Sequence, residues 1–175
     1  MIVNVIGLGD TATEFKPDGN ITIGVNDVRG CDYQVCVDSH TAFDNKRFST
    51  IIHLKVKSFF TQKSEWGSYL NFNGHKKPKD IVKHINLKAV HAHNNRWNEF
   101  IPSSNNSPFV ACGVAYRYFN ATEIYLYGVD FNDHPHLNGA MREQSVKDFQ
   151  LLQKILNEKG CRIIPHEKSY LYGKI

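Results

Sequence analysis

The sequence of 175 residues lacks any run approaching the ~20 consecutive apolar residues that cross a membrane. Its first residues, MIVNVIGLGD, carry neither a basic lead nor a small-residue cleavage site, so we expect no secretion signal. Cys31, Cys36, Cys112 and Cys161 follow neither the spacing of a metal site nor that of a redox pair, which favours free thiols. These absences predict a cytoplasmic protein without membrane contact, in the cytoplasm of a host cell if the protein is viral.

Several catalytic and binding motifs are also missing. Gly7 and Gly9 have no third glycine at the spacing of a dinucleotide fingerprint, and no Gly-Lys-Ser or Gly-Lys-Thr triplet is present. No serine or cysteine lies in the pattern of a nucleophile elbow. The sequence therefore gives no support to NAD-dependent dehydrogenases, P-loop NTPases, or serine and cysteine hydrolases.

Acidic residues are scarce in the middle of the chain. Between Lys46 and Asn98 there are eleven Lys or Arg residues and two acids, a charge of +9, whereas the rest of the chain carries −5. Aromatic residues interleave with these basic residues, which suits a phosphate backbone and stacked bases. A solvated surface with a few inward-facing aromatics is the alternative. The residues that we expect to bind an anionic acceptor are Lys76, Lys77, Lys79, Arg96 and Trp97.

What is present is a series of short apolar runs that end at Gly, Asp or Asn. In the first half they cover residues 2–6, 21–25, 33–37 and 51–56, and they are apolar on both faces, as buried parallel strands are. In the second half we expect a helix at 108–118, a strand at 123–129, a helix at 141–156 and a strand at 161–164. Ser107 is the expected N-cap of the first helix, with Pro108 at its first position.

These elements predict an α/β fold, a Rossmann-like, mostly parallel sheet flanked by helices. We expect residues 1–175 to form a single domain in which 57–106 is a basic irregular insertion or substrate-facing lobe, with a short strand at 89–93. The final strand–helix–strand unit implies a right-handed crossover and a parallel pair. In such a sheet ligands bind at the carboxyl ends of the strands.

The segment Gly7-Leu8-Gly9-Asp10-Thr11 follows the first expected strand. Glycines let a nucleotide or a phosphate approach the backbone closely, and the N-terminus of a following helix favours negative charge. The segment is therefore a candidate nucleotide-binding turn, and a plain tight turn is the alternative.

Polar residues also end the second and third expected strands. Asn26 and Asp27 can bind a base or a ribose through hydrogen bonds. Asp38 can hold ribose hydroxyls or a divalent cation such as Mg²⁺ or Mn²⁺, with His40 as a second ligand, although two residues make an incomplete metal site. Caps and turns explain the same residues.

The strand expected at 123–129 is followed by a loop that contains Asp130, His134 and His136. An imidazole with a pKa near 6.5 suits general base catalysis, and a neighbouring carboxylate orients the ring. A surface turn with incidental histidines is the alternative.

Taken in order, the motifs GLGDT, GVND, DYQVCVDSH, NSPFVACGVA and EIYLYGVDF resemble a Rossmann-like group. This group contains the bacterial sialyltransferases of the Campylobacter type and the archaeal MptE-like pterin diphosphokinases. The resemblance covers about residues 1–40 and 105–131 and leaves out the basic middle. It implies a nucleotide-contacting turn, a nucleotide-contacting Asn after the second strand, and a histidine base after the strand ending at Asp130.

The resemblance carries over to individual residues. Those that match its nucleotide-binding positions are Gly7, Gly9, Asp10, Asn26 and Ser107. Asp130 matches the strand end, and His134 or His136 is the implied base. Asp10 and Thr11 depart from the Asn and Pro-Ser of the sialyltransferases, and Pro108 replaces a glycine beside Ser107.

These observations lead to three hypotheses. The first is a nucleotide-sugar-dependent glycosyltransferase whose acceptor hydroxyl belongs to an anionic molecule, such as phage DNA with hydroxymethylated bases. The second is an MptE-like diphosphotransferase that uses ATP and Mg²⁺. The third is a protein that binds a nucleotide or nucleic acid without catalysis.

Overall fold

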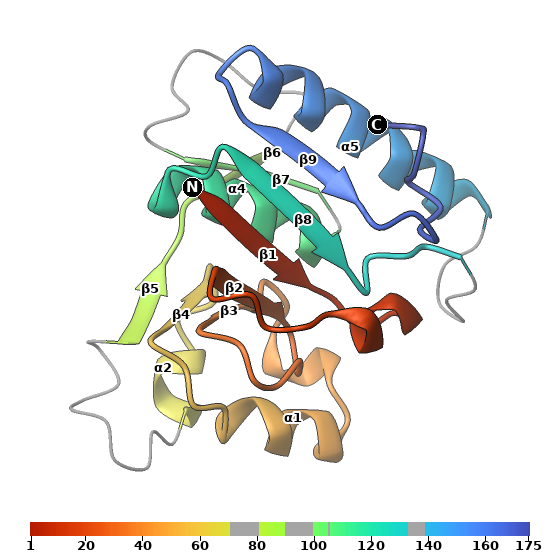
Figure 1. The fold of residues 1–175 in the computed structure, drawn as a ribbon. Coiled ribbons are helices and arrows are strands. Elements are labelled where there is room, and N and C mark those ends of the chain that lie inside the picture. The colour runs from red at the N-terminus through yellow and green to blue at the C-terminus, as the bar shows by residue number, and fades with distance from the viewer. Residues whose placement is uncertain (71–80, 90–99, 105, 133–138) are drawn as a thin grey trace.

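The computed structural model describes residues 1–70, 81–89, 100–104, 106–132 and 139–175. Its main sheet has seven strands in the order β5-β4-β3-β2-β1-β8-β9, all parallel, and a second sheet pairs β6 with β7 (Figure 1). The strands are β1 (Ile2–Ile6), β2 (Ile21–Val25), β3 (Tyr33–Val35), β4 (Ser58–Thr61), β5 (Val82–His84), β6 (Leu87–Ala89), β7 (Ile101–Ser103), β8 (Glu123–Tyr127) and β9 (Arg162–Pro165). The chain therefore has the expected α/β, Rossmann-like fold.

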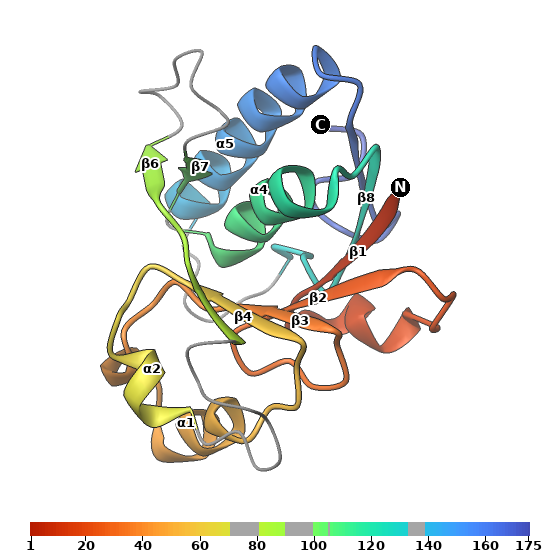
Figure 2. The ribbon, with the colours of Figure 1, turned by 90° about the vertical axis from the view of Figure 1, so that its left-hand side faces the viewer.

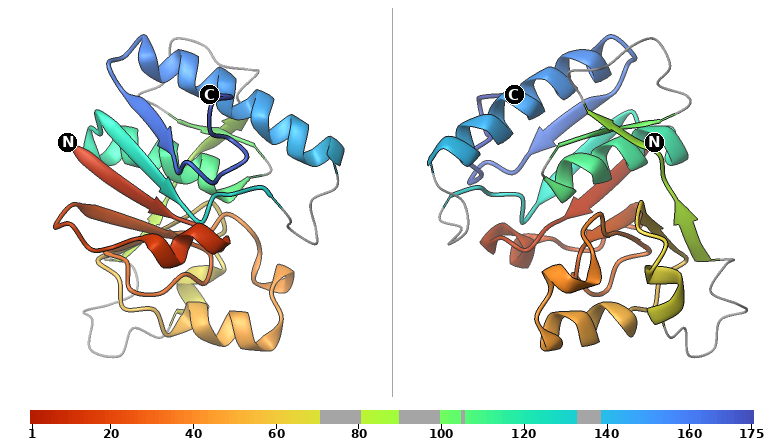
Figure 3. Two further views of the ribbon diagram at one scale, coloured as in Figure 1. Left: turned by 45° about the vertical axis from the view of Figure 1, so that its right-hand side comes forward. Right: turned by 180° about the vertical axis from the view of Figure 1, so that it is seen from behind.

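Helices cover both faces of the main sheet. The α-helices are α1 (Asn45–Ile52), α2 (Trp66–Tyr69), α4 (Ser107–Phe119) and α5 (Gly139–Asn157), and the 3-10 helices are η1 (Asp10–Glu14) and η2 (His40–Ala42). Helices α4 and α5 lie on one face with the small β6–β7 sheet, and α1 and α2 lie on the other (Figure 2). Two further views, turned by 45° and by 180°, show the helices on either side of the main sheet (Figure 3).

Two apolar clusters hold these layers together. The larger one includes Val5 in the sheet, Phe109 in α4 and Phe149 in α5, whose two aromatic rings meet edge to face at 5.6 Å. The smaller one lies on the α1 and α2 side and includes Phe59 and Trp66, both fully buried. Burying one such side chain contributes about 1.5–3 kcal/mol, so the strands and their ends are held firmly from both faces.

Most of the expected elements are confirmed. The strands expected at 2–6 and 21–25 are β1 and β2, and the helices expected at 108–118 and 141–156 are α4 and α5. Strands β8 and β9 form a parallel pair connected through α5, as the strand–helix–strand pattern predicts. The strand expected at 33–37 is shorter, since β3 ends at Val35.

The strand expected at 51–56 is wrong, because this run begins inside helix α1. The side chain of Asp44 caps α1 by accepting a hydrogen bond from the backbone N–H of Arg47 at 2.8 Å. Ile51 faces the smaller cluster from the last turn of the helix, and Leu54 joins the cluster three residues later. The β-branched residues of this run favoured a strand, although the segment belongs in part to a capped helix. The fourth strand is Ser58–Thr61, which contains two phenylalanines.

The basic middle is only partly covered by the described residues. Strands β4 and β5 fall within 57–106 and extend the main sheet, so part of this range is sheet rather than insertion. The strand expected at 89–93 is described only at its first residue, Ala89, where β6 ends. Residues 90–93 lie outside the described part. The division of the chain into a domain and a lobe stays a prediction.

All four cysteines are buried and free of disulfides. Burial raises the pKa of Cys31 and of Cys161 to about 11, and it raises the pKa of Cys36 and Cys112 further still. None of them is poised as a nucleophile, because the thiolate is the reactive form. Among the described helices, none combines the length and the apolar character needed to cross a bilayer.

Candidate functional site

The turns that follow β1 and β8 are bonded to each other at the edge where the parallel strands end, which we call the carboxyl edge. The N–H of Gly7 donates to the carbonyl of Tyr127 at 2.7 Å, and the N–H of Gly9 donates to the carbonyl of Gly128 at 2.8 Å. Strands β1 and β8 are neighbours in the sheet. After β1 the chain continues to β2, on one side of this pair, whereas after β8 it continues to β9, on the other side. This reversal between adjacent strands is where open α/β sheets bind ligands.

Glycines in these two turns allow a close backbone approach. Gly128 has a φ of +64°, and a Cβ at this position would lie 2.6 Å from the carbonyl oxygen of Gly7 and 2.8 Å from the Cβ of Ala12. A side chain on Gly7 would overlap Gly128 in the same way. In the turn predicted to contact a nucleotide, the Cα atom of Gly7 therefore packs directly against the turn after β8.

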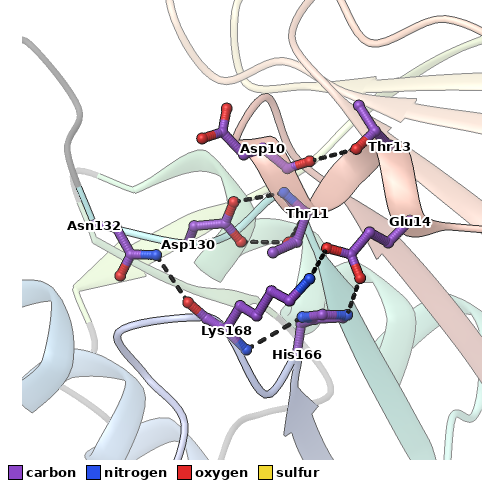
Figure 4. Close-up of polar contacts among 9 residues, drawn as sticks. Asp10, Thr11, Thr13, Glu14, Asp130, Asn132, His166 and Lys168 are labelled. Carbon is purple, nitrogen blue, oxygen red and sulfur yellow. Dashed lines mark hydrogen bonds and ion pairs between the residues drawn. The ribbon is translucent and has the colours of Figure 1, made fainter.

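Thr11 and Asp130 lock the two turns together (Figure 4). The carboxylate of Asp130 accepts a hydrogen bond from the backbone N–H of Thr11 at 2.9 Å and a short second one from the Thr11 hydroxyl. The Thr11 hydroxyl in turn accepts a bond from the N–H of Gly128 at 2.7 Å. Both side chains are buried, so we assign them to positioning the turns, whereas the sequence suggested catalysis for Asp130 and nucleotide contact for Thr11.

Glu14, His166 and Lys168 lie together to one side of this pair (Figure 4). The Glu14 carboxylate lies 2.7 Å from the Lys168 ammonium and 3.4 Å from Nε2 of His166. The hydrogen bond from Lys168 is the main cause that lowers the pKa of Glu14. The side-chain amide of Asn132 donates to the Lys168 carbonyl at 2.8 Å, so the C-terminal segment is attached to both turns.

At the end of the neighbouring strand β2, Asn26 adopts the left-handed conformation with a φ of +56°. Its backbone N–H donates to the Val35 carbonyl at 2.9 Å. Its side-chain oxygen Oδ1 is buried and has no hydrogen-bond partner among the described residues. A buried acceptor without a partner costs free energy, which marks Asn26 as a candidate contact for a hydrogen-bond donor.

Asp27 follows Asn26 and is bonded to Arg47, while its contact with a nucleotide stays a prediction. Its carboxylate accepts two hydrogen bonds from the guanidinium of Arg47, at 2.6 and 3.0 Å, and so ties the end of β2 to α1. Hydrogen bonding to Asp27 is also the main cause that raises the pKa of Arg47. The Asp27 carboxylate thus holds α1 against the carboxyl edge.

Ser107 lies at the start of α4, buried, but it is not the cap. The N-cap is Asn106, whose side chain accepts a hydrogen bond from the N–H of Phe109 at 3.3 Å. The helix packs against β1 and β2. Since α4 leads directly into β8, which runs parallel to them, its N-terminal end lies at the carboxyl edge. Ser107 is therefore near the turns that the sequence assigned to the nucleotide.

His40, the predicted partner of Asp38 in a metal site, is bonded to Glu65 instead. Nδ1 of His40 lies 3.0 Å from a Glu65 oxygen that also accepts a 2.5 Å bond from the hydroxyl of Ser39. The bond from Ser39, followed by that from His40, lowers the pKa of Glu65 to about 2. Among the described residues, no group of three or more His, Cys, Asp or Glu side chains is arranged to hold a metal.

Seven predicted site residues lie outside the described part of the chain: His134, His136, Lys76, Lys77, Lys79, Arg96 and Trp97. Their roles stay predictions from the sequence. Asp10 is exposed on η1, and its backbone carbonyl accepts a hydrogen bond from the hydroxyl of Thr13. The carboxyl edge thus brings together Gly7, Gly9, Thr11, Asn26, Ser107 and Asp130.

Two residues of this edge were missed from the sequence. Gly128 falls within the range expected to be a strand, although a glycine between apolar residues often marks a turn or a close backbone approach. Gln34 lies inside the apolar run YQVCV, where a buried amide signals a specific hydrogen bond. The amide of Gln34 donates to the carbonyl of Asn26 at 2.7 Å.

A separate hollow of about 710 Å³ lies at the opposite edge. Its lining comes from the segments that lead into β2, β3 and β4, and it includes Asp18, Asp32 and Lys57. Asp32 is bonded there to Lys57 at 2.8 Å. The hollow therefore faces away from the residues that the sequence assigned to a nucleotide.

No protein-family model and no curated protein matches the sequence. Among solved structures, the chain is similar to a mutant of the α-2,3/8-sialyltransferase CstII, with a TM-score of 0.54 and 14% identity over 100% of this chain and 85% of that chain. It is also similar to CstII from Campylobacter jejuni in complex with the substrate analogue CMP-3FNeuAc, with a TM-score of 0.51 and 16% identity over 96% of this chain and 87% of that chain. The comparisons give no support to the link with MptE-like diphosphokinases, and the likeness to CstII shows that the two chains share a fold.

Proposed function

We propose that this protein is a glycosyltransferase that binds a nucleotide-sugar donor at the carboxyl edge, across the ends of β1, β2 and β8. The buried Oδ1 of Asn26, which has no partner among the described residues, carries the proposal, because a ligand can supply its missing hydrogen-bond donor. An amino or hydroxyl group of a nucleoside provides such a donor. The fold shared with CstII, which was solved with a CMP-sugar analogue, makes a CMP-linked sugar the first donor to test.

The reaction uses a base and a leaving group. A hydroxyl oxygen of the acceptor attacks the anomeric carbon of the sugar, while the bond from that carbon to the phosphate oxygen of the nucleotide breaks. The hydroxyl proton passes to His134 or His136, and the nucleotide leaves with its negative charge. Asp130 precedes these histidines by a few residues, so its bonds to Thr11 fix the start of their segment beside the glycine turn.

A divalent metal has no built site in the described part of the chain. His40 contacts Glu65, Asp130 contacts Thr11, and no cluster of three ligating side chains is found there. We therefore derive no step through Mg²⁺ or Mn²⁺. Backbone N–H groups at the start of α4 favour the charge of the leaving phosphate, because a helix N-terminus carries a partial positive charge.

The test is a binding and turnover screen with CMP-, UDP- and GDP-linked sugars and ATP, each with and without Mg²⁺. A saturating donor at about 100 times its dissociation constant raises stability by about 2.7 kcal/mol, which a thermal-shift assay detects. We expect stabilisation by one nucleotide sugar. Stabilisation and consumption of ATP alone, with Mg²⁺, would indicate the diphosphotransferase, and binding without release of sugar would indicate a non-catalytic protein.

Replacing Asn26 by glycine tests the donor site directly. Glycine accepts the left-handed backbone, so Asn26→Gly removes the side-chain amide without backbone strain. We expect the dissociation constant of the donor to rise about ten-fold, as for the loss of one hydrogen bond worth ~1.4 kcal/mol. Isothermal titration calorimetry measures this change.

Asn120 provides the matched control. It has a similar left-handed backbone, with a φ of +51°, but it caps the far end of α4, before β8 begins. We expect Asn120→Gly to leave donor affinity unchanged. Equal effects of the two substitutions on affinity would argue against a nucleotide at Asn26.

The basic middle supports an anionic acceptor, such as DNA with hydroxymethylated bases. Neutralising Lys76, Lys77 and Lys79 to glutamine is expected to weaken acceptor binding and to reduce the slope of log affinity against log salt by about one for each phosphate that is no longer neutralised. Acceptor titrations at several salt concentrations measure the slope. If the slope of the triple variant equals that of the parent protein, these lysines do not bind the acceptor.

A further inference from the structure

We infer that Gln34 is a positioning residue that holds Asn26 in the conformation needed to bind the donor, an inference that rests on the proposed function. The amide nitrogen Nε2 of Gln34 donates to the backbone carbonyl of Asn26 at 2.7 Å. The N–H of Asn26 donates to the carbonyl of Val35. Strand β3 therefore holds both polar backbone groups of Asn26.

The burial of Gln34 indicates that this hydrogen bond is specific. Its side chain is fully buried, and burying an amide is costly unless it makes hydrogen bonds. Its oxygen Oε1 has no partner within the described ranges, so the bond from Nε2 to Asn26 is what offsets that cost. An apolar residue of similar size is the simpler occupant of a buried strand position.

Gly24 provides the space for this hydrogen bond. In the β2–β3 register Gly24 lies opposite Gln34, and a Cβ on Gly24 would be 2.6 Å from Oε1 of Gln34. The Gln34 side chain thus occupies the volume that a side chain at position 24 would fill. It reaches along β2 to Asn26, two residues further on.

The link to function is the conformation of Asn26. A non-glycine residue with a positive φ costs about 1 kcal/mol or more, although Asn tolerates this region better than most residues. The two bonds from β3 offset that cost and fix the direction in which the side chain leaves the backbone. Without the bond from Gln34, the Asn26 amide loses its fixed position for a ligand.

The experiment combines hydrogen exchange with CMP binding. Gln34→Met has a similar volume and no donor, so the Asn26 carbonyl loses its bond while the Asn26 N–H keeps its acceptor on Val35. The backbone at Asn26 then opens more easily, and we expect exchange of the Asn26 amide to be about ten-fold faster, measured by ¹H–¹⁵N spectra. We expect the dissociation constant of CMP to rise about ten-fold. Gly24→Ala is expected to give the same two changes, because it displaces the Gln34 amide.

Two further variants separate positioning from a loss of stability. In the Asn26→Gly background, Gln34→Met is expected to cause no additional loss of CMP affinity, because the effect passes through the Asn26 side chain. Thr22→Val removes two part-buried hydrogen bonds between β2 and Asp32: the Thr22 hydroxyl donates to the Asp32 carboxylate at 3.0 Å and accepts from the Asp32 N–H at 2.8 Å. We expect this variant to leave CMP affinity unchanged.

Unchanged exchange at Asn26 in folded Gln34→Met overturns the inference, as does an equal loss of CMP affinity in Thr22→Val. If Gln34→Met speeds exchange at Asn26 but the parent protein does not bind CMP, the positioning by Gln34 is supported and the CMP-linked donor is contradicted. The two failures are therefore distinguishable.

Discussion

Asp130→Ala is expected to destabilise the protein by about 2–4 kcal/mol, because it leaves two buried donors of Thr11 without an acceptor. These donors are the backbone N–H and the hydroxyl of Thr11, which lie beside Gly128 in the linked turns. Since total stability is about 5–15 kcal/mol, a change of this size is a large fraction of it. Urea unfolding measures it as a shift of the midpoint at constant slope.

Two further substitutions define the effect. Asp130→Asn keeps an acceptor for the Thr11 N–H and loses the one for the hydroxyl. Its free energy of unfolding is therefore expected to lie between that of the parent protein and that of Asp130→Ala. Asp10→Ala removes an exposed carboxylate four residues from Glu14 and is expected to stay within about 0.5 kcal/mol of the parent protein. Similar costs for Asp130→Ala and Asp10→Ala would rule out the lock between the turns.

Gly128→Ala is expected to cost about 2–5 kcal/mol, because backbone strain and atomic overlap act together. Its φ of +64° penalises any side chain by about 1–2 kcal/mol. The new methyl group would also lie 2.6 Å from the carbonyl oxygen of Gly7, which is backbone and cannot turn aside. Overpacking of this kind adds about 1–3 kcal/mol. The midpoint of urea unfolding or the yield of folded protein shows the loss.

Gly160 separates the two contributions. Its φ of +74° resembles that of Gly128, but no atom of the described residues lies within 4 Å of the position of its Cβ. Gly160→Ala therefore carries the backbone strain alone and is expected to cost about 1–2 kcal/mol. If both alanine variants are equally stable, the turns after β1 and β8 do not pack closely against each other.

Local patterns predicted much of the fold. The β-branched runs of β1 and β2 ended at glycine or Asn, and the helical spacing of Val146, Phe149 and Leu152 identified α5. Helix α1 was mistaken for a strand because Ile51 and Ile52 are β-branched, while the decisive signal was a single capping carboxylate at Asp44. Strand pairing order depends on contacts between distant residues, so neighbouring sequence does not determine it.

The site was harder to predict than the fold. Asn26 lies at the carboxyl edge because strand ends of a parallel sheet meet there, which the sequence pattern implied. Ser107 reaches the same edge because it begins helix α4, which leads back into β8. The partners of the polar residues were not predictable, since Thr11 and Asp130 are separated by 119 positions in the chain. Two side chains that the sequence placed in the site, those of Asp27 and Asp130, are bonded to Arg47 and Thr11, which no local pattern predicted.

The central claim is that a nucleotide binds at the carboxyl edge, and a titration of ¹⁵N-labelled protein with CMP followed by ¹H–¹⁵N spectra tests it most directly. We predict that the amide signals of Gly7, Gly9, Asn26 and Ser107 shift in parallel with CMP concentration and saturate. Saturable shifts confined instead to Asp18, Gly30, Cys31 and Lys57, which line the hollow at the opposite edge, would contradict the claim.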